Sequence, residues 1–498
     1  MKILKIFLIL SIIIFSSFPV FAIKEEKYYK QHVEQNIYLD NPDPSDYLTF
    51  EDLVKLSKEA KPKGQLKSKL ENHLSMVYLV NRTEKATLER PYIRVAQWNI
   101  KRGFNVNEII SIVTNPNDYK SKYLRNIKGK TQKVFNEELK TFSSADIFCF
   151  NEVDIGMPRT GYKNIASTIS DSLGWNYAYA SEFIEVGPIF QKEKINELQY
   201  RGLHGNVIIS RFPIISAKVI RLPNFYDWYK EEVKIKQSPL EHFRKFGAKA
   251  IFRERILHHE VRHGGRSAII ADIKLPNEKT ITVVLTHLED RAYSDERLKQ
   301  FKYILSNIKD KKSPVILTGD FNTSTTDTKP TSAKKEVNKR VRDPHYLLRQ
   351  AAFIPVPFVP VVGGIAAVTF SKLLQYKDPI FPSIPVLFPN HERKFFNYLK
   401  KFRFADGNGF DLNGDRKQSS NGKAGLLANS NQRHWKGFKS TYKLEEPRII
   451  AYFKLDWFFI KPTGNHFKPF NGRTMRTLNR SYKGGISDHN PITVDISL

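Results

Sequence analysis

The chain has 498 residues, of which 41% are hydrophobic, so it is long enough to bury a large core. Its formal net charge of +29 favours polyanionic partners, although a solvated basic surface without a specific partner is the simpler alternative. The single cysteine, Cys149, excludes an intramolecular disulfide; because it lies in an apolar run, we expect a buried thiol and no nucleophile.

The first residues have the pattern of a secretory signal peptide. Lys2 and Lys5 lie before an apolar stretch over 6–15. Val20 and Ala22 lie three and one residues before the expected cleavage site, which follows Ala22. The stretch is shorter than the roughly 20 residues that a membrane-spanning helix needs. We therefore predict that residues 1–22 are a signal peptide and that the mature protein is exported, either periplasmic or secreted.

Residues 23–90 are polar and charged, and helical patterns but no strand are evident in them. Thr49 and Asp52 form a candidate capping box, and a helical stripe follows at Leu66, Leu70, Leu74 and Val77. We expect a helical N-terminal arm here, followed by one domain over 91–498.

From Ile93 onward, short β-rich runs alternate with helical patterns, which indicates an α/β fold. The predicted strands span 93–98, 147–151, 206–210, 267–273, 280–286, 315–318, 450–460 and 492–496. The predicted helices span 129–141, 163–173 and 294–308.

Two insertions interrupt this pattern, at about 221–262 and 327–445. The second contains 351–370, twenty uncharged residues, and an apolar, Pro-rich stretch that ends at 389. Its prolines and glycines argue against a membrane-spanning helix. Two alternatives remain, namely burial as core or lid and peripheral attachment of 351–389 to a membrane.

Polar residues follow several apolar strands at their carboxyl ends, where α/β folds hold their chemistry. Each of them alone has a structural explanation as a turn former, helix cap or buried histidine. Five such strand ends in one chain make coincidence a poor explanation. They end in Asn99, Asn151-Glu152, His287, Asp320-Phe-Asn322 and Asp488-His489.

These motifs resemble the endonuclease/exonuclease/phosphatase superfamily, which has a deoxyribonuclease-like fold. The resemblance covers about 93–498 without the insertions. It implies two packed mixed β-sheets flanked by helices, a four-layer sandwich with the site at one rim. Its marks are Trp-Asn-Ile at 98–100, Asn-Glu-Val-Asp at 151–154, Gly-Asn-Val-Ile-Ile-Ser-Arg-Phe-Pro at 205–213, Thr-His-Leu at 286–288, Gly-Asp-Phe-Asn at 319–322, Leu-Asp-Trp at 455–457 and Ser-Asp-His-Asn-Pro at 487–491.

The resemblance also implies roles for individual residues. Mg²⁺ or Mn²⁺ would be held by Glu152 with Asn99 and Asp488, since hard cations prefer carboxylate and amide oxygens. Asp320 would align and deprotonate the attacking water with Asn322 beside it, and His489 would handle the second proton with Asp456 fixing its tautomer. Phosphate oxygens would be contacted by His287, Asn206 and Arg266.

One family feature is absent. Several members have a phosphate-contacting tyrosine three residues before the Asn of the Gly-Asn motif, where this chain has Leu203, with Tyr200 and His204 nearby.

The predicted function is Mg²⁺-dependent hydrolysis of phosphodiester or phosphomonoester bonds, with nucleic acid as the first substrate class. A lipid head-group phosphodiesterase or phosphatase of the sphingomyelinase or phosphoinositide type is the alternative, favoured by 351–389. A noncatalytic polyanion-binding protein is the alternative from another class, and the intact set of site residues argues against it.

Overall fold

The computed structural model describes residues 37–39, 47–83, 86–88, 90–186, 195–233, 261–323, 393–412, 441–445 and 449–498. The predicted signal peptide and the apolar segment 351–389 lie outside the described residues. No helix in the described ranges is both long and apolar enough to cross a membrane.

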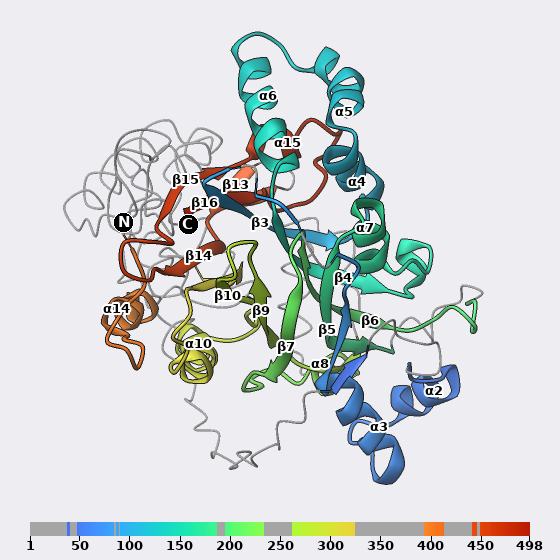
Figure 1. Ribbon diagram of the computed structural model, residues 1–498. Helices are drawn as coiled ribbons and strands as arrows, with labels where there is room; N and C mark the ends of the chain where they lie inside the picture. The colour runs from blue at the N-terminus through green and yellow to red at the C-terminus, as the bar shows by residue number, and fades with distance from the viewer. Residues whose placement is uncertain are drawn as a thin grey trace, which may run out of the picture. The chain divides into compact units, whose positions relative to one another are not determined.

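Two mixed β-sheets form the centre of the fold (Figure 1). The larger has nine strands in the order β1-β2-β5-β6-β4-β3-β16-β15, with β8 paired to β5. These strands span Ile37–Leu39 (β1), Met76–Val80 (β2), Tyr92–Arg102 (β3), Ile147–Ile155 (β4), Asn176–Glu185 (β5), Leu203–Ser210 (β6), Arg262–Gly264 (β8), Pro469–Thr474 (β15) and Ile492–Ser497 (β16).

The smaller sheet has five strands in the order β14-β11-β10-β9-β7. They span Ile214–Arg221 (β7), Ser267–Lys274 (β9), Thr280–His287 (β10), Val315–Asp320 (β11) and Asp456–Lys461 (β14). A separate two-stranded ribbon consists of Tyr442–Glu445 (β12) and Ile449–Phe453 (β13).

Alternation of side chains along each strand divides the core into layers. In β3, Ile93 and Val95 face the smaller sheet, whereas Trp98 and Ile100 face the helices on the other side. The smaller sheet alternates in the same way, with Ile316 inward and Leu317 toward its own helices. One apolar core therefore lies between the sheets and one on each outer face, which confirms the predicted four-layer sandwich.

Helices supply the two outer layers. Buried residues of α4, α6 and α7 pack on the larger sheet, and those of α10 and α14 pack on the smaller one. The described helices are Phe50–Lys58 (α2), Gly64–Ser75 (α3), Val106–Thr114 (α4), Pro116–Tyr123 (α5), Lys130–Ser143 (α6), Ile165–Leu173 (α7), Trp228–Val233 (α8), Ser294–Ile308 (α10), Arg393–Lys401 (α14) and Arg476–Asn479 (α15).

The N-terminal arm is only partly helical, so the expectation of no strand before Ile93 was wrong. Thr49 and Asp52 do form the predicted capping box at the start of α2. Val77, however, belongs to β2, which pairs with β5 of the larger sheet. The helical stripe ends before it because Met76–Val80 is a continuous apolar run buried on both faces, and such a run fits a sheet better than an exposed helix.

Two further differences concern strands. The expected strand 450–460 is two strands, since the chain leaves the β12–β13 ribbon at Lys454 and enters the smaller sheet at Asp456. Among the strands after Ile93, β5, β7, β8, β12 and β15 were not predicted. Cys149 is a free thiol that is buried, as predicted, and burial raises its pKa, which disfavours the nucleophilic thiolate.

Candidate active site

The predicted site residues continue the inward-facing rows of both sheets beyond the apolar core. Residues two or four apart in a strand point to the same face. In β3, Gln97 and Asn99 therefore lie on the same inward face as Val95. In β11, Asp320 lies on the same inward face as Ile316. Both rows become polar at the same end of the core. A buried polar site between the sheets results.

Strand register in the smaller sheet brings three predicted residues side by side. His287 of β10 is the partner of Asp320 in β11, and Asp320 is the partner of Asp456 in β14. The approach of β10 to β11 requires glycine at 319, where φ is +142° and a Cβ would lie 1.8 Å from the Thr286 carbonyl oxygen. The Gly-Asp pair of the motif is therefore a packing requirement as well as a chemical one.

The carboxylate of Asp320 lies at the centre of the site. Its Oδ2 is 3.6 Å from Nε2 of His287, 3.6 Å from Nε2 of His489 and 3.2 Å from Nδ2 of Asn99. Its Oδ1 accepts a hydrogen bond from the backbone N–H of Asn322 (2.9 Å). Burial raises the pKa of Asp320 to about 7, although the charge of His489 acts in the opposite direction.

His489 has an acidic partner on each side. Its Nδ1 donates to Oδ2 of Asp456 (2.8 Å), and Oδ1 of Asp456 accepts from Nε2 of Gln97 (2.9 Å). Burial lowers the pKa of His489, but the carboxylates of Asp456 and Asp320 outweigh burial and raise it to about 10. The two carboxylates therefore favour the protonated form of this imidazole.

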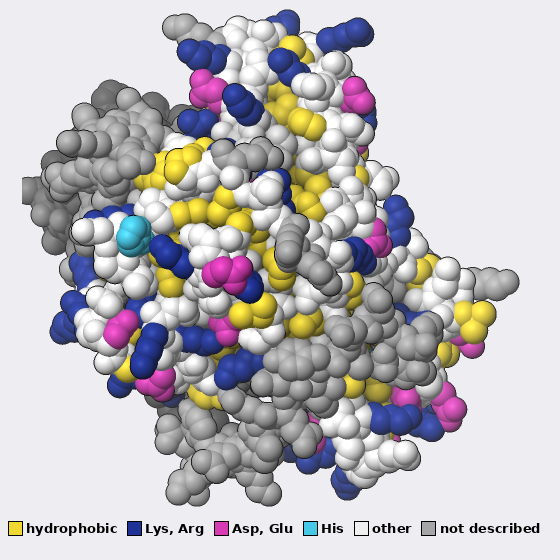
Figure 2. Space-filling view, in the orientation of Figure 1, with side chains coloured by type: hydrophobic (Ala, Val, Ile, Leu, Met, Phe, Trp, Pro, Cys, Tyr) yellow, Lys and Arg dark blue, Asp and Glu magenta, His cyan; other side chains and the backbone are white. Residues whose placement is uncertain are grey.

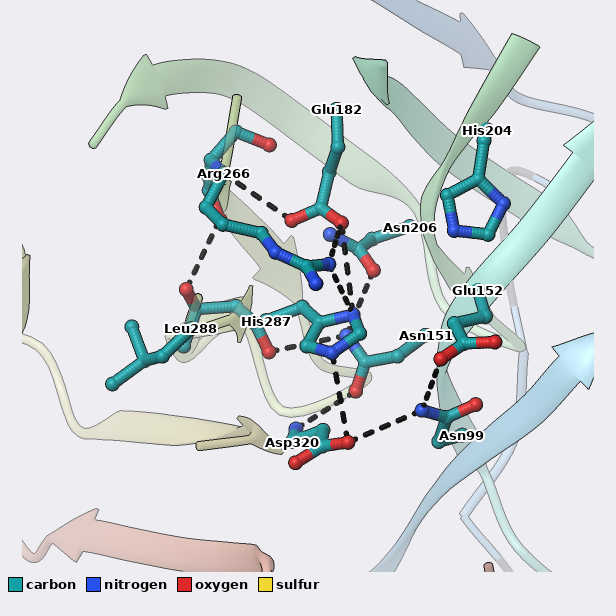
Figure 3. A network of polar contacts seen from close by, with 12 residues as sticks. Asn99, Asn151, Glu152, Glu182, His204, Asn206, Arg266, His287, Leu288 and Asp320 are labelled. Atoms are coloured by element: carbon teal, nitrogen blue, oxygen red, sulfur yellow. Dashed lines mark hydrogen bonds and ion pairs between the residues drawn. The ribbon is translucent and has the colours of Figure 1, made fainter. Parts of the chain in front are cut away.

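His287 has the opposite electrostatic setting (Figure 3). Nη1 of Arg266 donates to its Nδ1 (2.9 Å), and burial together with this guanidinium lowers the pKa of His287 well below its usual value. A guanidinium can only donate, so this contact needs Nδ1 as its acceptor, while Nε2, the atom nearest Asp320, faces the amide group of Asn322. Asn322, whose φ is +46°, donates from Nδ2 to the Leu288 carbonyl (3.0 Å) and lies 3.1 Å from the same Nε2.

Arg266 is occupied by protein groups. Besides His287, it donates to Oε2 of Glu182 (2.9 Å) and Oδ1 of Asp290 (3.2 Å), and its Nε is 3.5 Å from Oε2 of Glu289. The guanidinium is buried, with 5% of the residue exposed. The predicted phosphate contact would compete with these carboxylates, and the observed contacts fit a residue that orients His287.

The predicted metal-binding residues converge from three segments. Nδ2 of Asn99 is 3.0 Å from Oε1 of Glu152, whose φ of +55° is unusual for a glutamate. Ser487 donates to the Asn99 carbonyl oxygen (2.7 Å), which keeps the neighbouring Asp488 beside this pair. Two carboxylates and an amide, with Asp488 exposed to solvent, suit a hard cation that retains several waters.

A second group of possible metal ligands consists of Asp320, Asp456 and His489, which offer atoms within 4.8 Å of one another. The direct hydrogen bond between His489 and Asp456 already uses Nδ1 and one carboxylate oxygen. We therefore interpret this group as a proton-handling set.

Asn206 of β6 has a buried amide nitrogen that lacks a hydrogen-bond partner. Its Oδ1 accepts from Nδ2 of Asn151 (2.8 Å), and Oδ1 of Asn151 in turn accepts from the backbone N–H of Asp320 (2.9 Å) and from Gln97. An unsatisfied buried donor is costly, so Nδ2 of Asn206 is available for an anionic ligand.

The chain matches one known protein family. The profile of the Endonuclease/Exonuclease/phosphatase family matches residues 96–351. The chain belongs to this family. Its members hydrolyse phosphate esters and generally use a divalent metal ion. Asp456, Asp488 and His489 follow the matched region in sequence, and the fold returns them to Asp320 and Asn99.

Known structures of this family resemble the chain at low identity. An endonuclease/exonuclease/phosphatase from Beutenbergia cavernae is 15% identical, with 82% of this chain and 72% of that chain covered and a TM-score of 0.33. An AP endonuclease from Archaeoglobus fulgidus is 12% identical, with 82% and 100% covered and a TM-score of 0.37. The human Nocturnin catalytic domain is 13% identical, with 82% and 95% covered and a TM-score of 0.35. No curated protein matches the chain.

All ten predicted site residues belong to this connected set of contacts, whereas the residues that hold them in place were not predicted as part of the site. Gln97 and Asn151 adjoin predicted residues, and their strand positions were the available signal. Glu182 was also missed, although a charged residue in a strand that is buried throughout is unusual. Leu203 belongs to the apolar core, and Tyr200 donates its hydroxyl to the Glu185 carbonyl (2.7 Å), so neither of them supplies the missing tyrosine contact.

Proposed function

We propose that this protein is an exported, metal-dependent phosphoesterase that cleaves phosphodiester bonds, with nucleic acid as its first substrate class. One observation carries the proposal: the buried carboxylate of Asp320 lies 3.6 Å from an imidazole nitrogen of His287 and from one of His489, and the neighbours of the two rings shift their pKa values in opposite directions. Groups in opposite protonation states around one acceptor suit acid–base catalysis of hydrolysis.

The residues have distinct tasks in this proposal. Asp320 accepts a proton from the attacking water, and Asn322 restricts the orientation of that water. His489 donates from Nε2 to an oxygen that gains negative charge, while Asp456 stabilises the imidazolium. Neutral His287 and Asn206 donate to nonbridging oxygens.

Asn99, Glu152 and Asp488 would hold the cation. When bound, a divalent ion supplies neutralisation of the charge on the phosphate oxygens. The side-chain oxygens of these residues are hard ligands, which favours Mg²⁺ or Mn²⁺.

Export is supported by the signal-peptide pattern of residues 1–22. Attraction of a polyanionic substrate is supported by the excess of basic residues. Lys and Arg side chains outnumber acidic ones on the face shown in Figure 2 and are spread over many elements, which suits general attraction of a polyanion.

Hydrolysis assays test the proposal. Mature protein is mixed with plasmid DNA, RNA, sphingomyelin or phosphoinositides in Mg²⁺, and again in EDTA. We expect Mg²⁺-dependent cleavage of nucleic acid and none by Glu152→Gln, which keeps the side chain's size but removes its charge. If no phosphate ester is cleaved by the wild type, the noncatalytic polyanion-binding alternative gains support.

Lipid hydrolysis is the second candidate, supported by the twenty uncharged residues at 351–370. Flotation with anionic vesicles tests it. In that case the mature protein should float and a variant without 351–389 should not. If neither floats, membrane attachment is wrong and the nuclease proposal is favoured.

A further inference from the structure

We propose that His204 contacts the substrate phosphate through Nε2, as a catalytic residue in addition to those identified from the sequence. This inference rests on the proposed phosphoesterase function. His204 lies on β6 two residues before Asn206, so the two side chains share the inward face of the strand. Gly205 between them is required, since a Cβ there would lie 2.1 Å from the Ala180 carbonyl oxygen.

The ring of His204 is held firmly from behind. Its Nδ1 donates to Oδ1 of Asp154 (2.8 Å), the residue opposite it on β4. Asp154 is fixed by Arg159, which donates Nε and Nη2 to its two oxygens at 2.6 and 2.9 Å. Arg159 also bridges to Glu185 at 2.6 and 3.0 Å. Only 2% of His204 is exposed, so the ring has little freedom to turn.

With Nδ1 bound to Asp154, Nε2 is the free end of the ring. In Figure 3 it points away from β6 toward the space bordered by Asn206 and Glu152. No contact within the described ranges gives Nε2 a hydrogen-bond partner, and Nδ2 of Asn206 is also unpartnered and buried. The free nitrogen of His204 therefore faces the part of the site where the proposed cation ligand Glu152 lies, whereas the amide nitrogen of Asn206 points to the side of Glu182 and Arg266.

An anionic oxygen is the ligand that fits this space. A ring with hydrogens on both nitrogens keeps Nδ1–H on Asp154 and offers Nε2–H to a phosphate oxygen. This contact would take the place of the tyrosine that the chain lacks.

Two substitutions separate this role from a structural one. His204→Asn retains an N–H donor near the position of Nδ1, and therefore the bond to Asp154, but has nothing at the position of Nε2. His204→Gln places an amide group near the position of Nε2 but has no donor at the position of Nδ1, so it loses the hydrogen bond to Asp154. His466→Asn, at an exposed histidine near the C-terminus, is the matched control.

Binding of inorganic phosphate is measured by calorimetry with and without Mg²⁺, together with the thermal unfolding midpoint. We expect His204→Asn to bind phosphate about 10- to 100-fold more weakly, which is the usual contribution of one charged hydrogen bond, with an unfolding midpoint near that of the wild type. His204→Gln should lose stability but retain more of the phosphate affinity. His466→Asn should change neither quantity.

Three results would overturn the inference. The first is wild-type phosphate affinity in His204→Asn, and the second is weakened Mn²⁺ binding with unchanged phosphate binding, which would make His204 a cation ligand. The third is absence of phosphate binding by the wild type. The proposed function is judged separately, by the hydrolysis assays.

Discussion

Replacement of Asp456 by asparagine tests the electrostatic core of the site. Asp456 is fully buried, and both of its oxygens accept hydrogen bonds, from Nδ1 of His489 (2.8 Å) and from Nε2 of Gln97 (2.9 Å). An amide offers one oxygen and one NH₂ group in their place. If the oxygen faces His489, the NH₂ group opposes the Gln97 donor; if it faces Gln97, the NH₂ group opposes Nδ1 and forces the other tautomer.

Either orientation removes the negative charge that stabilises the imidazolium. We expect kcat/KM to fall about 10²- to 10⁴-fold, as for other oriented histidines, which corresponds to about 3–5 kcal/mol of transition-state stabilisation. The free energy of unfolding should fall by a smaller amount, about 1–3 kcal/mol, which is the cost of one unsatisfied buried donor.

The assay compares steady-state hydrolysis, circular dichroism and urea unfolding for Asp456→Asn and a control. Asp272→Asn is the control, because Asp272 is also in the smaller sheet and accepts from Thr282 (2.6 Å) and Lys311 (2.8 Å) on other elements. Asp272→Asn should be less stable to urea but should keep the wild-type hydrolysis rate. An unchanged rate in Asp456→Asn would refute the reasoning and leave Asp456 as a structural acceptor.

Three further predictions follow from individual contacts. His489→Ala should lower kcat by at least 10²-fold while the circular dichroism spectrum is retained, and a variant with a tenth of wild-type activity would remove His489 from the proposed chemistry. Arg266→Lys cannot reproduce the fork that joins Glu182, Asp290 and His287, so kcat should fall while KM changes less than about threefold; a large rise in KM alone would instead indicate direct phosphate binding. His263 is buried with Nε2 2.7 Å from the Leu56 carbonyl oxygen, and burial lowers its pKa from 6.5. The unfolded chain therefore binds a proton more readily, so this stabilisation is complete above pH of about 6.5 and is lost as the pH falls. In urea unfolding at pH 7.5 and 5.5, His263→Gln should lose less stability on acidification than the wild type, and equal losses would contradict the assignment.

The alternation of short β-rich runs with helical segments in the sequence determined the α/β fold class. Runs such as 147–151 and 315–318 are short, largely apolar and followed by polar residues. Because side chains alternate along a strand, the apolar residues of each run form the core and the polar residues after them lie at one end of that core. Seven of the ten site residues were identified from their positions at strand ends, whereas Asn206, Arg266 and Asp456 were identified only from the resemblance to the family. Local information suffices for those seven, because the residue type and the strand end are both properties of a short segment.

Tertiary structure decided what these residues contact. Nothing near 266 in the sequence indicates that Glu182 and Asp290 occupy its guanidinium, since those partners come from other strands and loops. The opposite protonation states of His287 and His489 likewise depend on which charges surround each ring after folding. The strand at 76–80 was misjudged for the same reason: a helical stripe and a buried strand share the same residues there, and only pairing with β5 distinguishes them. The sequence thus specified the chemical groups of this protein, and the packing of two sheets determined their charges.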